Sequence, residues 1–97
     1  MPFAVMNVVT IEPEEAAALT ARLESASFGA IRGQAGFRSA RLYRSEDDTQ
    51  VVTITEWSTR EDFLAYRQTD DARRAVADAL AAHPKISFYE IVAAIEA

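Results

Sequence analysis

Five side chains in this sequence could take part in chemistry on a small organic molecule: Asn7, Trp57, Phe63, Tyr66 and His83. His83 is the only histidine, and because an imidazole titrates near neutral pH it is the candidate general base. Asn7 is the one polar residue on an otherwise apolar strand face, where its amide needs a hydrogen-bond partner. That partner is either a bound ligand or neighbouring backbone or water.

The three aromatic residues are candidates for binding a substrate. Trp57 ends a predicted strand, and Phe63 and Tyr66 lie three residues apart on the following helix, so they share one side of it and could line one cavity. We therefore predict a catalytic pair, Asn7 and His83, and a substrate-binding group, Trp57, Phe63 and Tyr66. Core packing is the competing interpretation for the aromatic residues, and stabilisation of a helix end is the competing one for His83.

Arginines on the second predicted strand are candidates for holding an anionic substrate. They are Arg38, Arg41 and Arg44. A solvated strand surface is the competing interpretation, because acidic residues are plentiful in this chain.

The composition excludes several other kinds of site. Without cysteine the chain has no disulfide and no thiolate ligand, and with one histidine an all-protein metal site is unexpected, so we expect no metal and no cofactor. A net charge of −5 is the wrong sign for binding nucleic acid. No apolar run approaches the ~20 residues that span a bilayer, and the N-terminus lacks a basic leader, so we expect no membrane partner and a cytoplasmic protein.

The 97 residues are expected to form a single domain, residues 1–97, that positions these side chains. Alternation and β-branched residues predict strands over 3–11, 37–44, 50–57 and 86–95. Apolar spacing predicts helices over 13–31 and from 58 to 83, the second one interrupted near Thr69-Asp70, where the aspartate can cap a new segment. The run Ser58-Thr59-Arg60-Glu61 predicts a capping box with Ser58 as the cap.

The element order β-α-β-β-α-β predicts an α+β fold of the ferredoxin-like, split βαβ type. Both helices then cover one face of a four-stranded antiparallel sheet. Because the strands are apolar on both sides, the uncovered face should meet another sheet, and the simplest partner is an identical subunit. We therefore expect a homodimer with facing sheets.

Stretches over most of the chain resemble the antibiotic biosynthesis monooxygenase (ABM) superfamily. They are Val5-Met6-Asn7-Val8-Val9-Thr10-Ile11, Gly36-Phe37-Arg38-Ser39 and Ile54-Thr55-Glu56-Trp57-Ser58-Thr59-Arg60-Glu61-Asp62-Phe63. The resemblance implies a dimeric α+β barrel, which agrees with the facing-sheet dimer. The resemblance indicates mainly the fold, because members of this superfamily catalyse different reactions.

Two subclasses of this superfamily can be compared by residue. The cofactor-independent, quinone-forming monooxygenases resemble this chain at Trp57, but their asparagine four residues earlier is Thr53 here and their tyrosine six residues later is Phe63. The haem-degrading monooxygenases resemble it at Asn7 and have a tryptophan where this chain has Tyr66. Their haem-ligating histidine would fall at residue 75 or 76, which are alanine and valine here.

The resemblance implies a cofactor-independent monooxygenase acting on a small aromatic, phenolic or enolisable substrate, with dioxygen as a candidate co-substrate. A haem-degrading type with an altered ligand is one alternative. A non-catalytic, small-molecule-binding dimer is another, and a role in breaking down a polar carbonyl signal is a third.

Overall fold

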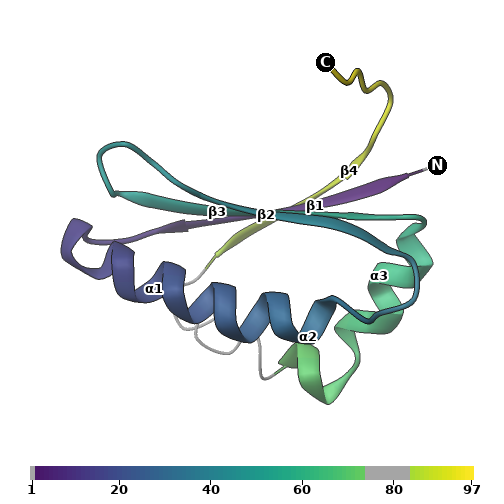
Figure 1. Cartoon of the computed structure of the whole chain (residues 1–97), viewed down its shortest axis with the longest axis horizontal. Coiled ribbons are helices and arrows are strands. Elements are labelled where there is room, and N and C mark those ends of the chain that lie inside the picture. Colours follow the sequence, from purple (N-terminus) through teal and green to yellow (C-terminus); the bar gives the residue numbers. More distant parts are fainter. Residues whose placement is uncertain (1, 74–83) are drawn as a thin grey trace.

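A computed structural model describes residues 2–73 and 84–97 of the chain. Four antiparallel strands form one sheet in the order β2-β3-β1-β4, with bounds β1 Phe3–Thr10, β2 Phe37–Arg44, β3 Gln50–Trp57 and β4 Lys85–Glu90. Figure 1 shows the described helices on one side of this sheet. The predicted α+β class, with a four-stranded antiparallel sheet, is confirmed.

The last strand is shorter than its apolar sequence predicts. The prediction of a strand over 86–95 is wrong beyond Glu90, where the regular structure ends. In the sheet that the described residues form, its one neighbour is β1, and Glu90 is already paired with Phe3, the first residue of β1. The chain beyond Glu90 therefore has almost nothing left to pair with there. The Ile91 N–H donates to the Pro2 carbonyl at 3.0 Å. After that the C-terminal segment leaves the sheet on the side away from the helices (Figure 1).

The first helical segment covers residues 13–31, as predicted, but it changes type along its length. It consists of η1 Pro13–Glu15, α1 Ala16–Leu23, the π-helical η2 Glu24–Phe28 and α2 Gly29–Ile31. A π turn is wider than an α turn, so it rotates the residues that follow it. Ile31 is therefore buried against the sheet, whereas Ala30, which the α-helical period places on that side, is only half-buried.

Helix α3, Arg60–Arg67, begins one residue later than the capping box predicts. The cap is Thr59: its hydroxyl accepts from the Asp62 N–H at 3.1 Å and donates to the Asp62 carboxylate at 3.0 Å. Ser58 does not take this role: it lies just past the end of β3, where its own N–H donates to the Gly36 carbonyl at 2.8 Å and holds it beside the start of β2. The Ser58 cap is thus corrected to Thr59.

A second helical turn over residues 70–73 follows α3. The predicted interruption is present, but its cap is Thr69 and not Asp70. The Thr69 hydroxyl accepts from the Ala72 N–H at 3.1 Å and donates to the Tyr66 carbonyl at 2.8 Å. None of the helices within the described ranges is long and apolar enough to cross a membrane.

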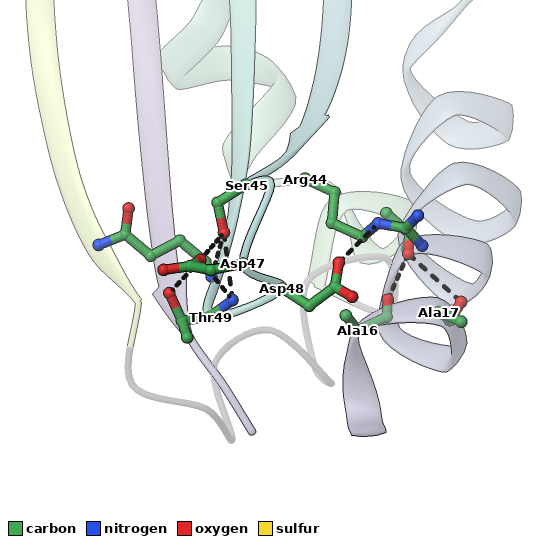
Figure 2. Close-up of polar contacts among 9 residues, drawn as sticks. Ala16, Ala17, Arg44, Ser45, Asp47, Asp48 and Thr49 are labelled. Atoms are coloured by element: carbon green, nitrogen blue, oxygen red, sulfur yellow. Dashed lines mark hydrogen bonds and ion pairs between the residues drawn. The ribbon is translucent and has the colours of Figure 1, made fainter. Parts of the chain in front are cut away.

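The turn between β2 and β3 fixes the register of the central hairpin (Figure 2). Asp47 accepts from the Ser45 hydroxyl at 2.8 Å, the Thr49 hydroxyl at 2.6 Å and the Thr49 N–H at 3.1 Å, and these bonds, those from Thr49 first, lower the pKa of its carboxyl. Asp48 has a φ of 60°, and its carboxylate pairs with Arg44 at 3.0 Å. With this turn in place, β2 and β3 have the predicted bounds.

The core lies between the sheet and the helices in two clusters. One consists of Phe3, Val5, Ile31, Trp57, Tyr66 and Ala72, and the other of Val9, Leu19, Leu23 and Val51. The alternation in β1 thus places Phe3, Val5, Asn7 and Val9 on the side that faces the helices. Asn7 comes between the two clusters.

Candidate functional site

A cavity of about 350 Å³ lies between the sheet and the helices at the level of Asn7. Its floor includes Val5 and Asn7 of β1 and Thr53 of β3, and Phe63 and Tyr66 of α3 form part of the opposite wall. Most of this lining is apolar. The cavity therefore contacts three of the five residues singled out from the sequence, namely Asn7, Phe63 and Tyr66.

A second hollow of about 440 Å³ lies at the start of α3. Its lining includes Phe3, Thr59, Glu61 and Glu90, and none of the five predicted site residues among the described ones. It is wider and more open to solvent, with a charged rim. We therefore take the smaller, more apolar cavity as the candidate site.

Asn7 lies in the middle of the cavity floor. It is half-buried and stands directly opposite Thr53 on β3 and Ile86 on β4. Directly opposed side chains in an antiparallel pair have Cβ atoms about 5 Å apart, so Asn7 and Thr53 can contact one small ligand group together. Within the described part of the chain the Asn7 amide has no hydrogen-bond partner. Its N–H groups are thus available to a bound molecule.

Tyr66 presents a neutral phenol to the cavity. It is 7% exposed, and burial, followed by the negative charge of Asp71, raises the pKa of its hydroxyl above the usual value. Across the described residues this hydroxyl has no hydrogen-bond partner. At neutral pH it can donate a hydrogen bond to a ligand but cannot act as an anionic base.

Trp57 supports the aromatic wall from behind. Its side chain is fully buried and is not among the residues that line the cavity. Its ring lies 5.3 Å from that of Tyr66 and 5.8 Å from that of Phe63, and its indole N–H donates to the Thr55 hydroxyl at 3.1 Å. The structure therefore places Trp57 where it can hold Tyr66 and Phe63 in position. His83, the predicted base, lies outside the described residues.

The cations at the cavity differ from those singled out on the second strand. Arg41 lies opposite Ile54, on the sheet face away from the helices, and Arg44 pairs with Asp48 in the hairpin turn. Arg38 does not line the cavity either. The arginines that line it are Arg67 and Arg73.

Two lining residues were not predicted as site residues although each carried a signal. They are Arg67 and Thr53, the second of which was named only as the position of the relatives' asparagine. Arg67 follows Phe63 by four residues and so shares its side of α3. Thr53 falls on the same strand parity as Thr55 and Trp57, which face the helices. The position of Arg73 depends on the helical turn capped by Thr69, for which the sequence predicts Asp70 as the cap. Within the described ranges, no group of three or more histidine, cysteine, aspartate or glutamate side chains is placed to hold a metal ion.

Solved structures share this fold over nearly the whole chain. Rv0793 from Mycobacterium tuberculosis has a TM-score of 0.81 and 20% identity over 99% of this chain and 100% of its own. SnoaB, a cofactor-independent oxygenase from Streptomyces nogalater, has a TM-score of 0.77 and 18% identity over 97% and 96%. A monooxygenase from the ActVA-Orf6 gene of Streptomyces coelicolor, in complex with nanaomycin D, has a TM-score of 0.78 and 24% identity over 99% and 91%.

Identities this low establish a common fold and leave the chemistry open. A comparison with curated proteins finds no match. The family model for the antibiotic biosynthesis monooxygenases matches residues 2–78, which include β1, the central hairpin and all of α3. The chain therefore belongs to the antibiotic biosynthesis monooxygenase family.

Proposed function

We propose that this protein is a cofactor-independent monooxygenase that oxidises a small phenolic or enolisable aromatic compound in the cavity above Asn7. The observation that carries the proposal is the Asn7 amide, which lines an apolar cavity and has no hydrogen-bond partner within the described residues. Membership of the family, and the oxygenase activity named for SnoaB, support it.

Such a reaction needs no external reductant if the substrate itself supplies the electrons. An activated CH₂ group next to aromatic rings loses a proton, and the resulting carbanion donates electrons to dioxygen. One oxygen atom becomes a ring carbonyl and the other leaves as water, so the four-electron oxidation of CH₂ to C=O balances the reduction of one O₂. The protein must therefore stabilise the substrate anion and exclude water around it.

Asn7 is suited to stabilise that anion. As the proton leaves, charge develops on the substrate oxygen conjugated with the carbanion, and the Asn7 side-chain N–H can donate to this oxygen. The quinone-forming relatives that the sequence resembles have their asparagine at the position of Thr53, directly opposite Asn7. The amide of this chain would thus serve the same part of the cavity floor from the neighbouring strand.

The remaining roles follow from the chemistry of each side chain. Phe63 and the ring of Tyr66 give the substrate an apolar wall, and the neutral Tyr66 hydroxyl offers a second donor. His83 is the proposed general base because it is the only side chain in the sequence that ordinarily titrates near pH 7. In this proposal, His83→Ala removes a near-neutral pKa from the pH dependence of the rate.

The face of the sheet away from the helices is the proposed interface of a homodimer. We call it the open face, and it carries Met6, Val8, Val52, Ile54, Tyr43 and Tyr89. Tyr43 and Tyr89 are each 47% exposed, and the strand residues between them are only half-buried. Arg41, Glu56 and Lys85 lie on the same face beside these apolar residues. A sheet face with this apolar group is suited to meet a second copy of itself.

Oxygen uptake with a hydroxyanthrone tests the proposed activity. We expect one O₂ to be consumed per anthrone converted to anthraquinone, without added metal, flavin or haem and at a rate above the spontaneous oxidation. Heat-denatured protein and a chelator serve as controls. Tight binding without uptake would instead identify a binding protein, and a strong Soret shift on adding haem would favour the haem-degrading type.

A further inference from the structure

We propose that the substrate carries a carboxylate, or an equivalent anionic group, which Arg67 and Arg73 bind at the helix side of the cavity. This inference rests on the proposed function only in taking the cavity as the substrate site. The class of ligand it names is an aromatic acid with a phenolic or ketonic oxygen at the end remote from its carboxylate.

The charges around the cavity carry the inference. The whole chain has a net charge of −5, with fifteen acidic residues against ten basic ones. Among the described residues that line the cavity, two are arginines and none is an aspartate or glutamate. Asp71, whose negative charge raises the pKa of the Tyr66 hydroxyl, lies nearby but is not among the lining residues. The two arginines that line the cavity therefore favour an anionic ligand.

Neither arginine is held strongly by an acidic partner in the described part of the chain. Arg67 has no ion pair there. Arg73 approaches Asp70 at 3.9 Å, but both side chains are largely exposed, at 72% and 83%, and an exposed pair at this distance is weak. Both guanidinium groups can therefore turn toward a ligand.

The two ends of the cavity offer different chemistry. Asn7 and Thr53 supply neutral hydrogen-bonding groups from the sheet, whereas Arg67 and Arg73 supply positive charge from α3 and the turn after it. A planar aromatic acid between Phe63 and the sheet would present its phenolic or ketonic oxygen to Asn7 and Thr53, and its carboxylate to the two arginines. A guanidinium can donate two parallel hydrogen bonds to a carboxylate, which neither Asn7 nor Thr53 can do.

Calorimetric titration without oxygen tests this preference directly. The two probes are 6-hydroxy-2-naphthoate and its neutral amide, 6-hydroxy-2-naphthamide, which differ in charge and hardly in shape. We expect the carboxylate to bind about tenfold more tightly at low salt, as for one charge-assisted contact, and the advantage to shrink as salt is added. The double variant Arg67→Gln/Arg73→Gln should bind both probes equally.

Arg32→Gln is the matched control, because Arg32 is an exposed arginine that does not line the cavity. It should keep the wild-type preference, and thermal melts should show all variants folded. Equal affinity of the wild type for both probes, or no binding of either, would overturn the inference. The preference is measured without turnover, so failure of the monooxygenase proposal would show separately, as absence of oxygen uptake with both a neutral hydroxyanthrone and a hydroxyanthrone that carries a carboxylate.

Discussion

The Asn7 amide and the Tyr66 hydroxyl share one cavity, and neither has a hydrogen-bond partner within the described residues. Both polar groups remain accessible to solvent, since no described side-chain N or O atom is buried without a partner, and a ligand that bonds to both would gain about 0.5–1.5 kcal/mol per hydrogen bond. Asn7 could be recognised from the sequence because it breaks an apolar alternation. The burial of Trp57 behind Tyr66 could not be recognised from the sequence, because it depends on how the start of α3 packs on β3.

Substitution of Tyr66 by phenylalanine should change the alkaline stability of the protein. The folded protein holds the phenolic proton more tightly than the unfolded chain, because burial and Asp71 raise the pKa of Tyr66. The free energy of unfolding that this raised pKa contributes is fully present below the tyrosine pKa of the unfolded chain, about 10, and it is lost as the pH rises through the pKa of the folded protein. Urea unfolding should therefore show that wild type loses more stability than Tyr66→Phe between pH 9 and pH 11. An equal loss of stability in the wild type and in Tyr66→Phe would contradict a raised pKa of the Tyr66 hydroxyl in the folded protein.

The start of α3 shows how tertiary contacts override a local motif. The sequence motif favours Ser58 as the cap, but the bond from its N–H to the Gly36 carbonyl keeps it beside the start of β2, just past the end of β3, and the cap is Thr59. Thr59→Ala should destabilise the protein by about 1 kcal/mol, whereas Ser58→Ala should change its stability by less than about 0.5 kcal/mol. Chemical denaturation of both variants measures this difference. A larger loss in Ser58→Ala would restore the cap predicted from the sequence.

The approach of β2 to α3 requires a glycine at position 36. Gly36 has a φ of 79°, and a Cβ atom there would lie 2.1 Å from the Asp62 carboxylate oxygen and 2.6 Å from the Asp62 Cβ. Gly36→Ala should therefore cost about 1–3 kcal/mol of unfolding free energy. Gly33→Ala is the matched control, because a Cβ at Gly33 meets nothing within 4 Å. Equal stability of the two variants would contradict this account.

Within the described residues, the strands and helices could be predicted in kind and mostly in extent; the predicted helix over 74–83 lies outside those residues. The central hairpin followed from alternation on both sides of a polar turn. The end of β4 could not be predicted from its own sequence, because β4 ends where its partner strand β1 begins, at Phe3. The rotation of Ile31 into the core also had no signal in the sequence, since an α-helical period does not reveal a π turn.

The assembly is a property of the whole molecule, and the open face leads us to expect a homodimer. Ile54→Asp places a charge at the centre of that face, where burial against a second sheet would be costly. Sedimentation equilibrium at micromolar concentration should show wild type at twice the 10.7 kDa chain mass and Ile54→Asp shifted toward the monomer. Ala17→Asp, on an exposed site of α1, should remain dimeric. A monomeric wild type would contradict the dimer.

The whole fold places one amide, Asn7, on the floor of an apolar cavity, and our account makes that amide the donor that stabilises the substrate anion. The most direct test is the oxygen uptake of Asn7→Ala with a hydroxyanthrone, alongside wild type and with folding checked by circular dichroism. We predict at least a tenfold fall in kcat/KM, as expected when a donor to developing negative charge is lost. An unchanged rate in a folded Asn7→Ala protein would contradict the account.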